Sequence, residues 1–436
     1  MNCGDLKKLF EKISKNVEEI SGNIHFFFHY PFHDLRHCRE MYKYLEDLRY
    51  SNLDLGYSEL WLLRTAIYLH DIGMFLNPRN WHKLRIPKDV LSLPGEDSIK
   101  ELTRDAVVKS FLDGLGMSFE DAFFDENNCL RLPPQLKGKP WDEFSLLEKI
   151  AVRTVMRELH PQIGDWAVRR KFIGEYPPEC RKISEIIGGI VRLHEDKDSE
   201  RIRNLGSWEI AGSLNIDQRK LTAILILLDS LDCVGQSRAS PETLDEIMDD
   251  IRMLEEKMIE IEAEKGDDIS KGCGHLPHWV FKKYIKRIEV CPSRITVVVE
   301  TTSPSYLAGI LFFEMSNNVW PKYALASKIL KEYGYHFDLV VQIPSPVCGE
   351  QLMEEELAKL EKEFSEIIVE TSELPREFGE KYKIGLKLPR ALALLLSYGG
   401  SYKEYADQLA KKHVCRLLAK LGNGQRSLLE KIFKCG

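Results

Sequence analysis

The sequence predicts a mainly α-helical bundle followed by a smaller α+β domain. Apolar residues recur at helical spacing from residue 6 to about residue 268, with few of the alternating runs that strands show. After a glycine-containing break at residues 272–277, alternating apolar residues appear. Because 436 residues exceed one ordinary domain, we expect a helical domain at residues 1–270 and an α+β domain at residues 279–436.

The helical domain is expected to begin with an amphipathic helix. Its apolar face is formed by Leu6, Leu9, Ile13 and Val17. A further helix should follow Ser58, which we predict to be its N-cap, and should end at the His70-Asp71 pair before Gly73.

An insertion is expected between residues 77 and 144, where repeated prolines separate short helical stretches. Long insertions of this kind either cover a binding site as a lid or have no role at it. The sequence leaves both alternatives open.

The α+β domain should contain a hairpin, because apolar residues alternate at 288–290 and 295–299 on either side of a turn-like segment at residues 291–294. We expect a helix at residues 319–333, a strand at 337–343 and a helix at 352–364. Residues 402–433 should be helical and are broken by Gly422-Asn423-Gly424. This last part is either a helix-turn-helix-like element or an ordinary solvated helical surface.

An acidic helix is expected near the end of the helical domain. Residues 241–268 contain twelve acidic and three basic residues, and apolar residues from Leu244 to Ile261 step by three and four. Such a short heptad seam either pairs with a second copy of the chain, giving a homo-oligomer, or packs on its own domain.

The remaining charge shows no basic field of the kind that nucleic-acid-binding proteins carry. The formal net charge is −7, of which −9 falls in residues 241–268, so the rest of the chain is nearly neutral.

The N-terminus lacks the apolar run of a signal peptide, and no apolar stretch approaches the about 20 residues that span a bilayer. The ten cysteines form no Cys-x-x-Cys pair. We expect a cytoplasmic protein with reduced thiols and no membrane partner.

Histidine and aspartate residues form the clearest chemical pattern. His70 and Asp71 are adjacent at the end of an apolar helix, and His37 precedes them in the chain. Asp229 follows the apolar run Ile224-Leu225-Ile226-Leu227-Leu228, where a buried carboxylate requires a cation. Imidazole and carboxylate together suit Mn, Fe, Co, Ni or Zn ions better than Mg²⁺. No phosphate-binding loop, dinucleotide fingerprint or serine-hydrolase elbow occurs.

The order of these residues resembles a known superfamily. Phe32-His33-Asp34-Leu35-Arg36-His37, then His70-Asp71-Ile72-Gly73, then His160, His194 and Asp229 are similar to the ordered ligands of the HD superfamily of metal-dependent phosphohydrolases. The first segment also resembles the opening motif of cyclic nucleotide phosphodiesterases. The resemblance covers roughly residues 20–240 and implies an HD-domain helical bundle.

The resemblance implies a centre for one or two divalent transition-metal ions. His37, His70, Asp71 and Asp229 would hold the first ion, and His160 and His194 would complete a second, with Asp71 bridging both. Two ions about 3.5–4 Å apart clamp a phosphate group and activate water. By the same resemblance, Asp71 is a catalytic residue and His33 would protonate the leaving oxygen. His33 and His37 lie one helical turn apart, so which of them is the metal ligand stays open.

The sequence departs from the superfamily at two places. Met74 replaces the lysine that often follows His-Asp-Ile-Gly, and no Gly-Tyr-Pro signature occurs near His194. Arg157, Arg192 and Arg238 are candidates for binding a substrate phosphate, and we favour Arg157, one helical turn before His160. Cys273-Gly274-His275-Leu276-Pro277-His278 has zinc-compatible residues but no fourth ligand, so we interpret it as a linker.

These observations predict hydrolysis of a phosphate ester or anhydride in a small, nucleotide-like substrate. One alternative is a nuclease acting on single-stranded nucleic acid, which would need a basic groove and stacking aromatic residues. Another is a scaffold or signalling protein that uses the fold without catalysis. The α+β domain is expected to contain no metal-binding cluster of its own.

Overall fold

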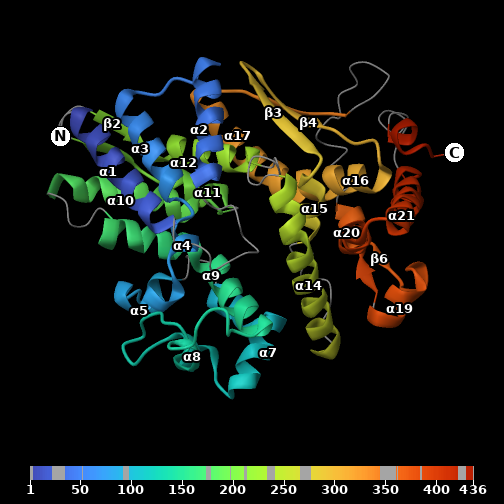
Figure 1. Ribbon diagram of the computed structural model, residues 1–436. Coiled ribbons are helices and arrows are strands. Elements are labelled where there is room, and N and C mark those ends of the chain that lie inside the picture. Colours follow the sequence, from blue (N-terminus) through green and yellow to red (C-terminus); the bar gives the residue numbers. More distant parts are fainter. Residues whose placement is uncertain are drawn as a thin grey trace. The chain divides into compact units, whose positions relative to one another are not determined.

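The computed structural model describes residues 3–21, 35–51, 53–91, 98–172, 178–196, 198–210, 214–232, 241–265, 276–343, 360, 362–382, 385–420 and 429–435. The chain forms two compact units, of which unit 1 comprises Met1–Arg49, Leu53–Asp229 and Leu325–Tyr335. Unit 2 comprises Tyr50–Asn52, Ser230–Ala324 and His336–Gly436. As predicted, a helical bundle is combined with a smaller α+β part (Figure 1).

Unit 1 is built mainly from helices. They are α1 (Cys3–Ser21), α2 (Leu35–Tyr50), α3 (Tyr57–Leu69), α4 (Ile72–Phe75), α9 (Leu146–Ala167), α10 (Pro178–Leu193), α11 (Ser199–Arg203) and α12 (Gln218–Leu231). The apolar face predicted for α1 is buried at Leu6, Leu9, Ile13 and Val17, and α1 packs on α3. Helix α9 packs on both α4 and α10.

Helix α3 begins earlier than predicted. Its N-cap is Gly56, whose backbone N–H donates a hydrogen bond to Glu59 Oε2 at 3.0 Å. Ser58 is therefore inside the helix, and the prediction that it caps the helix is wrong. The carboxylate of Glu59 satisfies an N–H group at the helix start, a role that Ser58 Oγ was expected to fill.

The insertion contains the short helices that the prolines predicted. They are α5 (Trp81–Leu84), α6 (Ser98–Arg104), α7 (Ala106–Leu115) and α8 (Phe119–Phe123), with 3-10 turns at Pro78–Asn80, Lys88–Val90 and Pro134–Leu136. Asp105 caps α7 by accepting hydrogen bonds from the N–H groups of Val107 and Val108. Helices α6 and α7 pack on α9.

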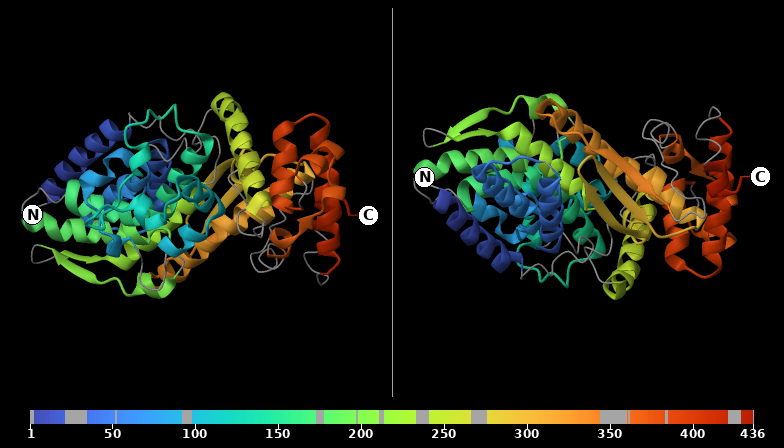
Figure 2. Two further views of the ribbon diagram at one scale, coloured as in Figure 1. Left: turned by 90° about the horizontal axis from the view of Figure 1, so that it is seen from below. Right: turned by 90° about the horizontal axis from the view of Figure 1, so that it is seen from above.

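Unit 1 also contains a short antiparallel hairpin that the sequence analysis missed. Strands β1 (Ser207–Ile210) and β2 (Leu214–Asp217) pair with each other, and the two green strands lie at the edge of unit 1 in both views of Figure 2. Each strand has four residues, which is too short for an alternating pattern to be recognised.

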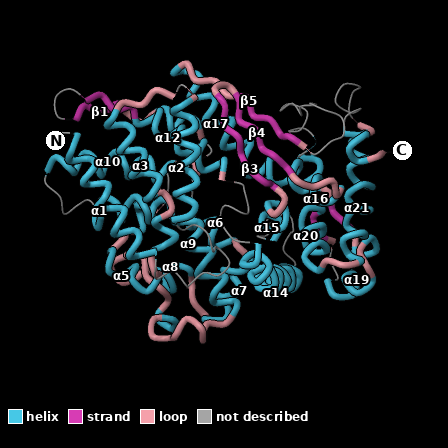
Figure 3. The backbone as a smooth tube through the Cα atoms, turned by 45° about the horizontal axis from the view of Figure 1, so that its top comes forward, coloured by secondary structure: helices cyan, strands magenta, loops and turns pink. Residues whose placement is uncertain are grey.

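Unit 2 contains the predicted hairpin. Strands β3 (Ile285–Cys291) and β4 (Arg294–Val299) are antiparallel, and β5 (Asp338–Gln342) adds to β4 in parallel (Figure 3). A second pair, β6 (Ile368–Val369) and β7 (Leu386–Lys387), is antiparallel. The helix predicted at 319–333 starts earlier, since helical structure runs through α16 (Pro304–Gly309), a π-helix (Ile310–Val319) and α17 (Trp320–Leu330), followed by a 3-10 turn (Lys331–Tyr333).

The remaining helices of unit 2 are α14 (Pro241–Lys265), α15 (Leu276–Lys282), α19 (Arg376–Tyr382), α20 (Leu388–Tyr398) and α21 (Ser401–Leu418), with a 3-10 turn at Thr371–Glu373. The predicted helix 352–364 lies mostly outside the described residues, as does the glycine break at 422–424. No helix in the described ranges has both the length and the apolar character to cross a membrane.

The acidic helix α14 buries part of its heptad seam within unit 2. Ile251, Leu254 and Ile261 are buried, and α14 packs on α15, α19 and α20. Two of its acidic residues, Glu255 and Glu262, form ion pairs with the buried Arg390. Its pairing with a second copy of the chain stays a prediction.

One pair of cysteines departs from the expectation of reduced thiols. Cys415, in α21, forms a disulfide with Cys435. Among the described residues, Cys38, Cys129 and Cys291 are thiols.

Candidate metal centre

Six side chains from five places in unit 1 converge on one buried point. His37 comes from the first turn of α2, His70 and Asp71 lie between α3 and α4, and His160 is in α9. His194 directly follows α10, and Asp229 is in the last turn of α12. The four imidazoles are at most 1% exposed, and the side chain of Asp229 is 9% exposed. The structure thus brings together all six residues that the sequence suggested as metal ligands.

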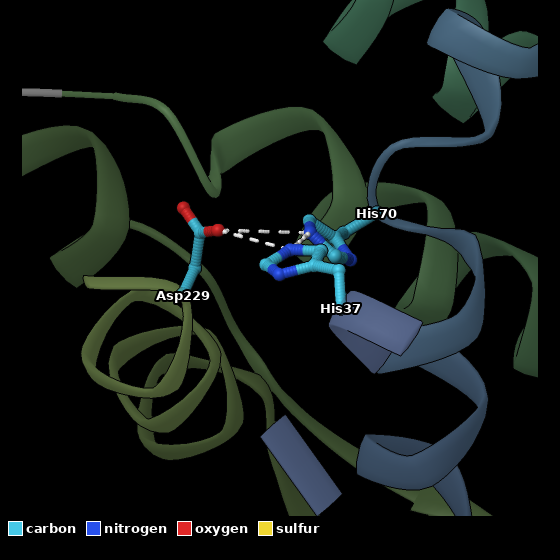
Figure 4. Close-up of side chains that lie close together, drawn as sticks. All are labelled: His37, His70 and Asp229. Atoms are coloured by element: carbon cyan, nitrogen blue, oxygen red, sulfur yellow. Dashed lines mark hydrogen bonds and ion pairs between the residues drawn. The ribbon is translucent and has the colours of Figure 1, made fainter. Parts of the chain in front are cut away.

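The first half of the centre consists of His37, His70 and Asp229 (Figure 4). Nε2 of His37 lies 3.0 Å from Nε2 of His70. Oδ1 of Asp229 lies 3.3 Å from His37 Nε2 and 3.7 Å from His70 Nε2. The three donor atoms therefore surround a single point.

The second half contains His160 and His194, whose Nε2 atoms are 3.2 Å apart. Asp71 lies between the halves and turns one oxygen to each. Its Oδ2 is 3.2 Å from His70 Nε2, and its Oδ1 is 3.4 Å from His160 Nε2 and 3.6 Å from His194 Nε2. In this position Asp71 could bridge two cations, one held by each half.

The spacing of the donor atoms fits a transition-metal ion. With ligand bonds of about 2.0–2.2 Å, neighbouring donors in tetrahedral or octahedral coordination lie about 3–3.5 Å apart. The distances of 3.0–3.7 Å in the first half and 3.2–3.6 Å in the second agree with that spacing.

Three of the histidines have their tautomer fixed by the backbone. Nδ1–H of His70 donates to the carbonyl of Ile67 at 2.8 Å, and Nδ1–H of His194 donates to the carbonyl of Val191 at 2.6 Å. Both carbonyls belong to the last turn of a helix, where the backbone offers them no partner. With the proton on Nδ1, the lone pair of Nε2 points into the centre, as a metal ligand requires.

His160 is oriented in the same way, although it lies inside a helix. Its Nδ1–H donates to the carbonyl of Arg157 at 2.6 Å. That carbonyl has no helical partner because the residue four positions later is Pro161, which has no N–H. A proline within α9 therefore provides the acceptor that aims His160 into the centre.

Gly73 allows α4 to approach α9 at His160. A Cβ atom on Gly73 would lie 2.1 Å from the carbonyl oxygen of His160. The sequence placed this glycine just after the end of a helix, and the structure shows that it is needed for the close contact between two helices.

Burial and charge act differently on two of the imidazoles. Burial alone would lower the pKa of His70, but the carboxylates of Asp71 and Asp229 outweigh it and raise that pKa to about 10. Burial lowers the pKa of His160, because Asp71 only partly compensates there. The carboxylates thus favour a positive charge in the first half of the centre. The lowered pKa of His160 favours its neutral form.

The other residues suggested from the sequence differ in their surroundings. Arg157 lies beside the second half, with its Nη1 3.4 Å from His160 Nδ1. Arg192 donates to Asp165 Oδ2 and to the carbonyl of Val90, which are structural contacts. Met74, the departure from the superfamily pattern, is buried. His33, Arg238, Cys273 and His275 lie outside the described residues.

Glu195 was missed by the sequence analysis. It forms a potential metal-binding group with His160 and His194. The available signal was its position directly after His194, where it repeats the imidazole-carboxylate order of His70-Asp71.

Unit 2 contains a different ionisable cluster, around the fully buried Glu314 of the π-helix. Glu314 Oε2 accepts hydrogen bonds from His278 and Asn318 at 2.9 Å each, and Lys282 lies 3.5 Å from Oε1. All groups of residues that could hold a metal ion are in unit 1, as far as the described residues extend.

Comparison with known proteins assigns the chain to a family. No curated protein and no solved structure matches the chain. The model of the HD-CE family matches residues 27–270, more than half of the chain, and this range includes all six residues of the metal centre. The chain therefore belongs to the HD-CE family, whose HD-type domain here carries a buried histidine-aspartate centre.

Proposed function

We propose that the protein is a metal-dependent hydrolase that cleaves a phosphate ester or anhydride bond in a small, nucleotide-like molecule with two metal ions. The observation that carries this proposal is the position of Asp71 between two pairs of imidazoles, whose Nε2 atoms face each other at 3.0 and 3.2 Å. In the second pair both Nδ1 atoms donate to backbone carbonyls, so two lone pairs face each other. The two lone pairs repel each other unless a cation lies between the nitrogens.

Different residues of the chain would bind the metal ions, bind the substrate and donate a proton. His37, His70 and Asp229 would hold one ion, His160 and His194 the other, and Asp71 both. When bound, two such ions polarise a phosphoryl oxygen and make water nucleophilic near neutral pH. Arg157, with its guanidinium beside the second half, would bind a phosphate oxygen, since its fork of donors suits that group. His33 would donate a proton to the leaving oxygen.

Two features favour a small substrate. Outside residues 241–268 the chain is nearly neutral, whereas a nucleic-acid-binding surface needs a basic field. The six ligands are almost completely buried, which suits a compact phosphate group better than an extended polymer.

The experiment is elemental analysis of full-length protein purified without added metal, followed by assays with Mn²⁺ on cyclic nucleotides, nucleoside di- and triphosphates and single-stranded oligonucleotides. We expect up to two transition-metal ions per chain and release of product from at least one nucleotide. Asp71→Ala serves as the inactive control. Cleavage of oligonucleotides alone would indicate a nuclease, and metal-free, inactive protein would indicate a scaffold.

A further inference from the structure

Glu195 and Arg157 form an ion pair at the edge of the second half of the metal centre. Oε1 of Glu195 accepts hydrogen bonds from Nη1 and Nη2 of Arg157, both at 3.3 Å. The side chains are 26% and 32% exposed, whereas those of His160 and His194 are at most 1% exposed. The pair therefore lies where the buried imidazoles meet solvent.

The same carboxylate oxygen is also within reach of the metal position. It lies 4.0 Å from Nε2 of His194, and one donor atom from each of His160, His194 and Glu195 lies within 4.8 Å of the others. A movement of about 1 Å would bring it to the spacing of neighbouring ligands around one ion. With Glu195 included, each half of the centre has two imidazoles, one terminal carboxylate and one oxygen of Asp71.

Arg157 lies against the His160 ring. Its Nη1 is almost equally distant from the two ring nitrogens of His160, at 3.4 and 3.5 Å. A nitrogen so placed lies over the ring, and the guanidinium is thereby held beside the centre by contacts other than Glu195. If Glu195 turned towards an ion, Arg157 would stay in position to meet an anion arriving from solvent.

We infer that Glu195 is the terminal carboxylate ligand of the second metal ion, and that its movement to this ion frees Arg157 to bind the phosphate of the substrate. The inference rests on the proposed two-metal hydrolase. Because the oxygen that would move to the ion is the one that pairs with Arg157, metal and phosphate binding become coupled. Coupling is reciprocal, so inorganic phosphate should also increase the affinity of the second ion.

The first test is a titration of metal-free, full-length protein with Mn²⁺. Binding is measured by calorimetry and by the electron paramagnetic resonance signal of a coupled Mn²⁺ pair. Wild type should bind two ions. Glu195→Gln should keep the first ion, bind the second at least about tenfold more weakly and lose the coupled signal. Glu195→Asp, which retains the carboxylate, should recover part of the second site. Glu200→Gln is the matched control, because Glu200 pairs with Arg203 at 2.9 Å in the same unit but belongs to no potential metal group.

The second test concerns Arg157. Arg157→Ala should bind the second Mn²⁺ up to about fivefold more tightly, because Glu195 no longer has to leave a partner in a half-exposed ion pair. The same variant should bind inorganic phosphate more weakly when loaded with Mn²⁺. Arg203→Ala should change neither value.

Two results would overturn the inference, and they differ in what they say about the proposed function. If wild type and Glu195→Gln bind two ions equally well, Glu195 is not a ligand, but the two-metal hydrolase stands. If wild type binds a single ion, both the inference and the two-metal form of the proposed function fail. Thermal unfolding of each metal-free variant shows whether a lost site reflects lost folding.

Discussion

A Cβ atom on Gly73 would lie 2.1 Å from the carbonyl oxygen of His160, closer than atoms of two packed helices can come. We therefore expect Gly73→Ala to push α4 away from α9, to lower the free energy of unfolding by about 1–3 kcal/mol and to weaken the binding of the second metal ion. Urea unfolding and Mn²⁺ titration measure the two effects. Gly114→Ala in α7 is the matched control, because nothing lies within 4 Å of its Cβ position, and it should raise stability by about 0.5–1 kcal/mol. Equal effects of the two variants would contradict this prediction.

Pro161→Ala restores an N–H group that can compete for the carbonyl of Arg157. Because this carbonyl orients His160, we expect a loss of affinity for the second ion of up to about tenfold. The free energy of unfolding should not fall, since alanine suits a helix interior better than proline. Calorimetric Mn²⁺ titration together with thermal unfolding tests this. Unchanged affinity would show that the proline has no part in aiming the imidazole.

Asp71→Ala should abolish phosphohydrolase activity and the binding of both ions while the metal-free protein stays folded. Asp71 gives one oxygen to each half of the centre, so its removal disconnects the two metal positions. Relief of charge crowding in a buried site offsets part of the lost contacts. Turnover, metal content and circular dichroism of one preparation decide the matter, and a variant that retains both ions would exclude a bridging role.

His33→Ala should lower kcat while metal remains bound, by the 10²- to 10⁴-fold that general acid catalysis contributes. His37→Ala should lose metal, because His37 Nε2 lies within 3.0–3.7 Å of donor atoms of His70, Asp71 and Asp229. Metal content and turnover of both variants test this assignment. If His33→Ala loses metal and His37→Ala retains it, the roles are reversed.

Glu314 should make the stability of the protein depend on pH under acidic conditions. Burial alone raises the pKa of Glu314, but His278 and Lys282 outweigh it and lower the pKa below its ordinary value of 4.5. Its charge therefore stabilises the folded state fully above pH 4.5, and this contribution is lost as the pH falls through the lowered pKa.

Glu314→Gln should accordingly cost about 3 kcal/mol at pH 7, and the difference from wild type should shrink as the pH is lowered below 4.5. Urea unfolding between pH 7 and about pH 3 measures the difference. The exposed Glu404 in α21 provides the control substitution to glutamine. A difference that stays constant or grows on acidification would show that the pKa is not lowered.

The sequence predicted those parts of the structure that depend on local pattern. The hairpin around Cys291 and Arg294 could be found because residues on both sides alternate, and α1 because its apolar residues form one face. The hairpin β1–β2 could not, since four residues per strand give too little pattern. The cap of α3 was misplaced because glycine and serine are both possible N-caps, and only the three-dimensional start of the helix shows that Gly56 is used in place of Ser58.

The prediction of the metal centre was limited in the same way, because local pattern does not contain contacts between distant elements. Ligand types in order indicated the six side chains, but not which oxygen of Asp71 faces which imidazole pair. The role of Pro161 depends on a single carbonyl, and that of Gly73 on the distance between two helices. Only its position next to His194 in the sequence indicated that Glu195 could be a ligand. Contacts between distant elements determine these features, and local pattern does not contain them.

The ligands come mainly from the ends of helices, and this has an electrostatic consequence. His70 and His194 follow the last residues of α3 and α10, and Asp229 is in the last turn of α12, whereas α2 presents its N-terminal turn and Asp71 directly precedes the short helix α4. The carboxyl end of a helix carries a partial charge of about −0.5. Three such ends, added to the carboxylates, give the centre a negative potential that attracts cations and repels phosphates. With the proposed function, this potential predicts an order of assembly in which ions would bind first and reverse its sign before an anionic substrate approaches.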